Sequence, residues 1–111
     1  MKQRRERLAA SIQKAVAQEI MLRLPGRYVT VTEVEVSPDS KFASIWLSIL
    51  DEDKQESIFA EAEEIRGALR HAITKSTDIR RLPQIELRLD KRQKHAQRIS
   101  DLTRGAREKD S

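Results

Sequence analysis

The amino-acid sequence predicts a two-layer α+β sandwich, in which helices cover one face of a three-stranded sheet. Two long segments carry apolar residues at helical spacing, and three short segments alternate apolar with polar residues. These segments follow one another in the order helix, strand, strand, helix, strand. A chain of 111 residues can form one domain with its own hydrophobic core. We expect residues 1–104 to make up that domain and residues 105–111 to be a polar tail.

The first predicted helix covers residues 3–24. Its apolar stripe recurs every four residues and consists of Leu8, Ile12, Val16, Ile20 and Leu24. The helix is expected to end at Pro25 and Gly26, because proline cannot continue a helix and glycine allows the chain to turn.

The segment YVTVTEVEV is predicted to be a strand that contains an irregularity. The two valines before Thr32 share one side of the strand, whereas the two valines after Glu33 belong to the other side. A strand that keeps one face on the core cannot change sides without an extra residue. The pattern therefore predicts a β-bulge near Thr32 and Glu33.

A turn and a second strand follow. Residues 37–40 read SPDS, which is typical of a turn in which Asp39 bonds the local backbone. The strand over residues 41–50 alternates, with inward residues predicted at Ile45, Leu47 and Ile49. Trp46 falls on the opposite face, where it can stack on a base or, as we favour, pack against a terminus or the last helix. The two strands are expected to form an antiparallel hairpin.

The second helix is predicted to begin in the acidic segment DEDKQE, since acidic residues favour a helix N-terminus. Its buried stripe consists of Ile58, Ala62, Ile65, Leu69 and Ile73. The helix should stop around residues 77–83, and the third strand, QIELRLD, follows at residues 84–90. After this long helical crossover, the third strand is able to pair in parallel with a hairpin strand. Residues 91–104 are compatible with a short terminal helix.

Gly67 interrupts the second helix. Glycine in a helix interior costs about 1 kcal/mol relative to alanine, so the residue needs an explanation. It lies nearly opposite the buried stripe, which excludes close packing against the core, and no second glycine completes a phosphate-binding loop. A break in the helix and an ordinary surface glycine remain as alternatives, and the residues alone do not decide between them.

The charge is distributed unevenly along the chain. The 22 basic and 18 acidic residues give a net charge of +4. Residues 51–64 contain seven acids and one lysine, whereas residues 66–98 contain ten lysines and arginines and three acids. This pattern suits a molecule with one surface for phosphates and another that repels them, and incidental clustering on solvated helices explains the charge alone equally well.

Several classes of protein are disfavoured by the composition. The absence of cysteine excludes disulfides and thiolate metal sites. His71 and His95 do not form a metal-binding pair, and no glycine-rich phosphate loop follows a strand. No apolar run approaches the length needed to span a bilayer. We therefore expect a cytoplasmic, non-enzymatic protein without a cofactor, a metal or a small-molecule substrate.

The element order, with its glycine-interrupted second helix, resembles the KH-like domains that bind RNA, but the GxxG loop of a true KH domain is missing. The sequence is more specifically similar to the ribosome-binding factor A family. The segment YVTVTEVEVSPDSKFASIWLSIL resembles the first hairpin of that family, including the bulge and the Ser-Pro-Asp turn. The segments LPQIELRLDKRQKHAQRISDL and RRERLAASIQKAVAQEI resemble its third strand and first helix. The chain departs from the family at Ile65, where alanine is usual, and at Lys91, Arg92 and Lys94, where acids or serines are frequent.

This resemblance implies a KH-like (type II) sandwich whose second helix is kinked at Gly67. It also implies a monomeric factor that binds free small ribosomal subunits (30S) and assists late maturation and processing of 16S rRNA, near its 5′-terminal helix. The residues expected to contact RNA phosphates are Arg66, Arg70, Lys75, Arg80, Arg81, Lys91, Arg92, Lys94 and Arg98. Weaker candidates are Arg4, Arg5 and Arg7.

Two alternatives remain open at this stage. One is a KH-like module that binds a different RNA. The other is a protein-interaction domain whose working surface is the acidic segment 51–64.

Overall fold

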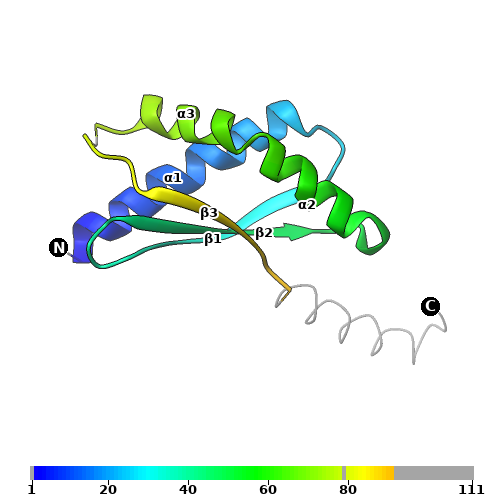
Figure 1. Ribbon diagram of the computed structural model, residues 1–111, viewed down its shortest axis with the longest axis horizontal. Coiled ribbons are helices and arrows are strands. Elements are labelled where there is room, and N and C mark those ends of the chain that lie inside the picture. Colours follow the sequence, from blue (N-terminus) through cyan, green and yellow to red (C-terminus); the bar gives the residue numbers. More distant parts are fainter. Residues whose placement is uncertain (1, 79, 92–111) are drawn as a thin grey trace.

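The structure is a computed structural model that describes residues 2–78 and 80–91. Its elements are α1 (Lys2–Arg23), β1 (Val29–Val36), β2 (Phe42–Ile49), the 3₁₀ helix η1 (Glu52–Lys54), α2 (Gln55–Glu64), α3 (Arg66–Ser76) and β3 (Gln84–Leu89). The strands form one sheet, and the helices lie together on one of its faces (Figure 1). The predicted two-layer α+β sandwich and its element order are confirmed. The predicted terminal helix and the polar tail over residues 105–111 lie outside the described residues.

The sheet has the order β1-β2-β3, with β1 antiparallel and β3 parallel to the central strand β2. Val31 pairs with Leu47 and Glu33 pairs with Trp46, so Thr32 has no partner in the ladder. The predicted β-bulge is therefore confirmed at this position. It allows the valines on both sides of the bulge to face the helices.

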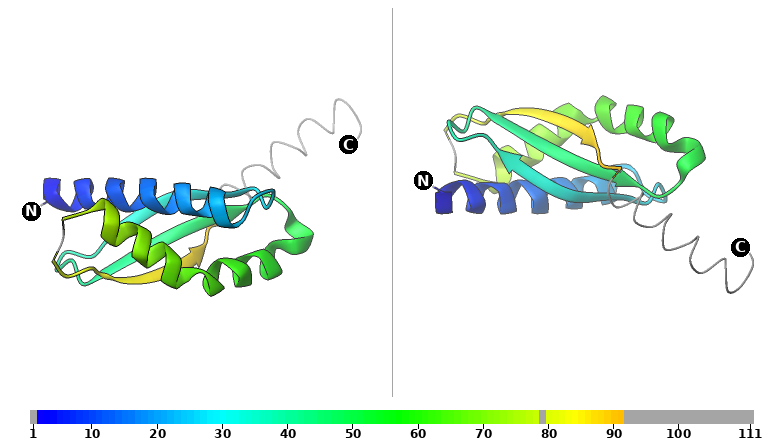
Figure 2. Two further views of the ribbon diagram at one scale, coloured as in Figure 1. Left: turned by 90° about the horizontal axis from the view of Figure 1, so that it is seen from above. Right: turned by 90° about the horizontal axis from the view of Figure 1, so that it is seen from below.

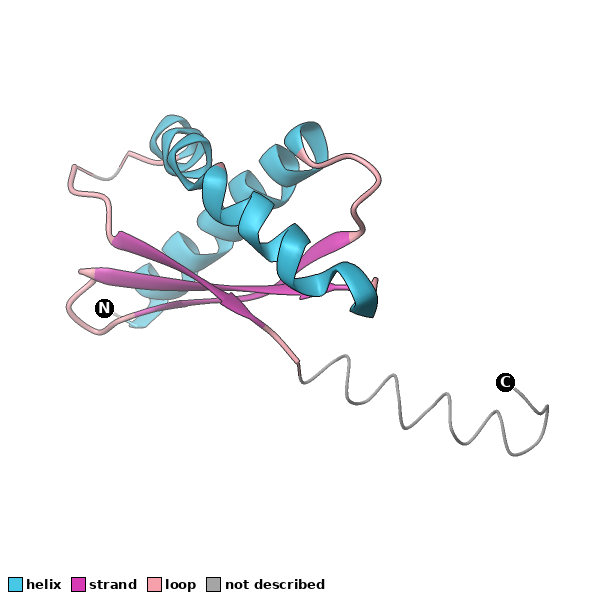
Figure 3. Ribbon diagram, turned by 45° about the vertical axis from the view of Figure 1, so that its right-hand side comes forward, coloured by secondary structure: helices cyan, strands magenta, loops and turns pink. Residues whose placement is uncertain are grey.

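The core lies between the sheet and the helices (Figure 3). Ile45, Leu47 and Ile49 of β2 are buried on the face of the sheet that the helices cover, and the stripe of α1 from Ile12 to Ile20 is also buried. α1 packs on β1 and on α3, and α2 contacts the central strand. Among the predicted core residues, Leu69 is fully buried and Ile65 is partly buried against the core.

The second helix is broken, but the break is not at Gly67. α2 ends at Glu64 and α3 begins at Arg66, and Ile65 between them has φ −99° and ψ 15°. Gly67 lies within the first turn of α3, without a positive φ, and a Cβ on it would meet no atom within 4 Å. The prediction of a kink at Gly67 is thus corrected to Ile65. Non-glycine residues can adopt this backbone conformation, and the Ile65 side chain is partly buried against the core.

The folded chain has two distinct ends (Figures 1 and 2). At one end, the first turns of α1 meet the β1–β2 turn and the α3–β3 loop. Arg5 Nη1 donates to the carbonyl oxygen of Val36 at 3.5 Å, and the Gln84 amide donates to the carbonyl oxygen of Lys41 at 2.8 Å. At the opposite end, the α1–β1 loop lies beside the segment that joins β2 to α2.

Candidate nucleic-acid interface

Cations from four chain segments, all exposed except the half-buried Arg5, gather where the N-terminus of α1 meets the loops. We call this surface the basic end, and it consists of Arg4, Arg5, Arg7, Lys41, Lys75, Arg80 and Arg81. Three carboxylates, those of Glu6, Asp39 and Asp78, belong to the same segments. The basic end is therefore a strongly positive surface, formed by residues that are far apart in the sequence.

The β1–β2 turn fixes the position of Lys41. The Asp39 carboxylate accepts hydrogen bonds from Ser37 Oγ at 2.6 Å and from the Lys41 amide at 3.1 Å. These two bonds, the one from Ser37 first, hold the pKa of the Asp39 carboxyl below its ordinary value. The predicted turn and its Asp39 bond to the local backbone are confirmed. The turn carries Lys41 to the edge of the basic end.

Three of the predicted contact residues lie at the basic end. Lys75 is in the last turn of α3, while Arg80 and Arg81 are exposed in the α3–β3 loop. None of the ion pairs found among residues 2–78 and 80–91 involves these three side chains. Their charges therefore face solvent and are available to phosphates.

Two further predicted residues have partners within the chain. Arg66 lies 3.8 Å from the Glu63 carboxylate, and Arg70 Nη1 donates to the carbonyl oxygen of Pro83 at 3.3 Å. The Arg70 side chain thus fastens the loop that carries the basic end to α3. These two arginines lie along α3 and are less available to an external ligand.

The other predicted contacts are not at the basic end. Lys91 follows the far end of β3, close to where the Asp90 amide donates to the carbonyl oxygen of Leu47. Arg92, Lys94 and Arg98 lie outside the described residues. The structure thus separates Lys91 from Arg80 and Arg81 by the full length of β3.

Sequence reasoning missed Lys41 and gave little weight to the three arginines of α1. Only the fold brings these residues beside Arg80 and Arg81. The sequence did contain a partial signal for Lys41. The alternation of β1 and β2 predicts a hairpin, and the turn of a hairpin must lie at one end of its sheet.

Trp46 lies half-buried on the sheet face opposite the helices. The guanidinium group of Arg88 lies 5.6 Å from the centre of its ring, and Arg88 also pairs with Glu86 at 2.9 Å. The favoured packing of Trp46 against the last helix involves a segment outside the described residues.

Residues 4–103 match the family model of ribosome-binding factor A. The chain belongs to the ribosome-binding factor A family. The ribosome-binding factor A of Fusobacterium nucleatum is 34% identical over 91% of this chain and 93% of that protein. The relative in Syntrophomonas wolfei is 30% identical over 91% of this chain and 88% of that protein. The resemblance read from the hairpin and the third strand is therefore confirmed.

Solved structures of ribosome-binding factor A have the same fold. The crystal structure of the Thermus thermophilus protein superimposes with a TM-score of 0.65 at 26% identity, covering 75% of this chain and 92% of that one. A Thermus thermophilus homology model, fitted into a cryo-EM map of a 30S–RbfA complex, superimposes with a TM-score of 0.58 at 23% identity. It covers 74% of this chain and 90% of that one. These likenesses support the KH-like sandwich.

Two classes of feature are not found in the described part of the chain. No helix there has the length and apolar character needed to cross a membrane. Residues 2–78 and 80–91 contain no group of three or more side chains arranged to hold a metal ion.

Proposed function

We propose that this member of the ribosome-binding factor A family binds the free small ribosomal subunit as a monomer in the cytoplasm. There it assists late maturation and processing of 16S rRNA, near the 5′-terminal helix, without catalysing a reaction itself. The proposal is supported by family membership, by a Thermus thermophilus relative fitted into a 30S complex, and by the basic end.

The basic end is the observation that carries the proposal. Lysine and arginine side chains bind phosphates regardless of sequence, and such contacts position a protein on RNA without reading bases. Four segments of one rigid fold present these cations together. The sandwich can therefore dock on folded RNA by its shape and charge, without the GxxG loop of a true KH domain.

The predicted contact residues are not proposed to contribute equally to RNA binding. Lys75, Arg80 and Arg81 are proposed as primary contacts, together with Arg4 and Arg7 in the first turns of α1. Arg5, which donates to the carbonyl oxygen of Val36, is proposed as a secondary contact. Arg66 and Arg70 are proposed as secondary contacts, because each already has a partner. Lys91, with Arg92, Lys94 and Arg98, is proposed as a separate contact beyond β3.

Co-sedimentation with purified ribosomal particles tests the proposal. We expect the protein to sediment with free small subunits, and not with large subunits or assembled ribosomes. The double variant Arg80→Glu/Arg81→Glu should bind small subunits much more weakly. The matched control Lys14→Glu/Lys54→Glu reverses two exposed cations outside the basic end and should bind normally. Equal binding to all particles would favour a general RNA-binding module, and equal losses in the two variants would contradict a role for the basic end.

A further inference from the structure

The end opposite the basic end exposes a concentration of apolar side chains. Within the described residues, four of the five exposed large hydrophobic side chains are there, with exposed fractions of 75% for Met21, 75% for Leu22, 70% for Tyr28 and 69% for Leu50. The Leu50 amide donates to the carbonyl oxygen of Tyr28 at 3.3 Å, which places these two residues side by side. Large apolar side chains that are exposed together on one surface are typical of interaction sites.

A run of carboxylates directly follows Leu50 in the chain. Asp51, Glu52, Asp53 and Glu56 lie where β2 leads through η1 into α2. We call this surface, together with Met21, Leu22, Tyr28 and Leu50, the acidic end. Lys54 is the one cation in the segment from Asp51 to Glu56.

The two nearby arginines do not offset this negative charge, because each is paired with a carboxylate outside the acidic end. Arg23 pairs with Glu19 within α1. Arg27 extends from the α1–β1 loop to Glu61 of α2, with Nε 2.9 Å from Oε1, and this bond raises the pKa of Arg27. The acidic end therefore stays negative and repels RNA phosphates.

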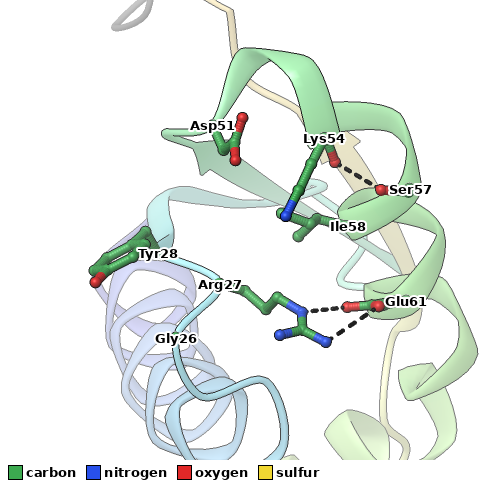
Figure 4. A pocket seen from close by; sticks show the side chains of 8 residues that line it. All are labelled: Gly26, Arg27, Tyr28, Asp51, Lys54, Ser57, Ile58 and Glu61. Atoms are coloured by element: carbon green, nitrogen blue, oxygen red, sulfur yellow. Dashed lines mark hydrogen bonds and ion pairs between the residues drawn. The ribbon is translucent and has the colours of Figure 1, made fainter.

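A pocket lies beside these residues, between the α1–β1 loop and the start of α2 (Figure 4). Its volume is about 300 Å³, with Ile58 among its lining residues and the Arg27–Glu61 pair across it. Tyr28 and Asp51 are part of its lining. The pocket gives a partner side chain a concave place to enter beside the exposed apolar residues.

We propose that the acidic end is a docking surface for an extended protein segment rich in lysine or arginine and also carrying apolar residues. The apolar side chains of such a segment would cover Tyr28 and Leu50, and its cations would face Asp53 and Glu56. This surface goes beyond the proposed RNA contact, and it lies at the opposite end of the sandwich from the basic end (Figure 1). The chain would then connect RNA at one end with a basic protein segment at the other.

Charge complementarity decides between this partner and the alternatives. RNA would place phosphates against the carboxylates. A second copy of the chain would offer its basic end as the positive surface. Of the five exposed large hydrophobic residues among the described positions, that end carries one, Phe42, at 53% exposure. A cationic and apolar segment satisfies both properties of the surface.

NMR titration of the full, ¹⁵N-labelled chain tests the proposal. The probe is a short peptide of alternating arginine and leucine, and the comparison ligands are the same peptide with glutamate for arginine and an RNA oligonucleotide. We expect the arginine peptide to shift amide signals at Tyr28 and over residues 50–57, and the glutamate peptide to leave them unchanged. RNA should shift signals of the basic end instead.

Variants make the test specific. Asp53→Lys/Glu56→Lys should weaken peptide binding about tenfold, since reversing exposed charges changes several pairwise interactions that are each small. Tyr28→Asn, chosen because asparagine tolerates the positive φ of 55° at this position, should also weaken it. The controls Glu35→Lys/Glu64→Lys and Phe42→Asn change equivalent exposed residues elsewhere and should bind normally.

Three results would overturn the proposal. The first is equal peptide binding by the wild-type chain, the variants at the acidic end and the controls. The second is a response of Tyr28 and residues 50–57 to RNA and not to the arginine peptide. The third is a dependence of those signals on protein concentration alone, which would assign the surface to a second copy of the chain.

Discussion

At the scale of single residues, the bulge in β1 and a buried carboxylate form one structural unit. Asp90, 3% exposed, is the one buried charged residue among the described positions, and its carboxylate accepts a hydrogen bond from Thr32 Oγ1. Thr32 is the residue that the bulge leaves without a ladder partner. The extra residue in β1 thus supplies a donor at the point where β3 ends, which a regular strand would not do.

Replacing Thr32 tests this unit. Thr32→Val keeps the shape of the side chain but removes the hydroxyl donor to a buried carboxylate, so it should destabilise the fold by about 1–3 kcal/mol. Thr32→Ser retains the hydroxyl and should cost clearly less. Urea unfolding measures both variants. Equal stabilities of the valine and serine variants would show that the hydrogen bond contributes little.

The Asp39 turn gives a prediction about pH. The hydrogen bond from Ser37 is the largest cause of the lowered pKa of Asp39, so Ser37→Ala should raise that pKa toward the ordinary value of 3.8. Because the folded-state pKa is lowered, the stabilisation is present above the unfolded-state pKa and is lost as pH falls through the folded-state value. NMR titration of the Asp39 side-chain carboxyl measures the shift. An unchanged pKa in the variant would contradict this account of the turn.

Gly67 now has a prediction opposite to the one that a kink at this residue would imply. It is exposed in α3, its φ is not positive, and a Cβ would meet no atom within 4 Å. Gly67→Ala should therefore stabilise the fold by up to about 1 kcal/mol, because alanine is the better helix former. Gly26→Ala is the contrasting variant and should destabilise, since Gly26 has a φ of +76°. Thermal unfolding compares the two, and a loss of stability in Gly67→Ala would restore a structural role for this glycine.

At the scale of elements, the alternation of apolar residues predicted the β-bulge correctly, whereas a glycine in the helix did not predict where the helix breaks. The bulge was predictable because strand side chains alternate with a period of two, so an inserted residue leaves a visible shift in the valines around Thr32. The position of the helix break was not predictable from Gly67. The break needs only a modest change of φ and ψ, which Ile65 adopts, and an isoleucine in an apolar stripe gives no local sign of it.

At the scale of the whole molecule, the fold converts a partly mixed charge pattern into two ends of opposite character. The sequence showed that residues 66–98 are basic and residues 51–64 acidic. It did not show that Arg4 and Arg81 share one end, or that Lys91 lies beyond the other end of β3. These relations depend on the course of the chain through the sandwich, and nonlocal pairing leaves no periodic signal in the sequence.

Salt dependence tests the electrostatic mechanism of the basic end. Affinity for small subunits should fall with salt, with a log–log slope of roughly −0.7 to −0.9 for each phosphate neutralised. Arg80→Glu/Arg81→Glu should make the slope shallower, because fewer phosphates are neutralised. Asp53→Gln/Glu56→Gln, at the acidic end, should leave the slope unchanged. Filter binding over a salt series measures these slopes, and a slope insensitive to the arginine changes would contradict phosphate contacts at Arg80 and Arg81.

Site-specific photocrosslinking on purified small subunits tests the central claim, that the basic end meets the RNA, most directly. A photoreactive amino acid is placed at Lys75 or Arg81 of the basic end, and at Glu56 of the acidic end as the comparison. We expect crosslinks to 16S rRNA from both positions of the basic end and none from Glu56. RNA crosslinks from Glu56 in the absence of RNA crosslinks from Lys75 and Arg81 would reverse the orientation proposed here and contradict the account.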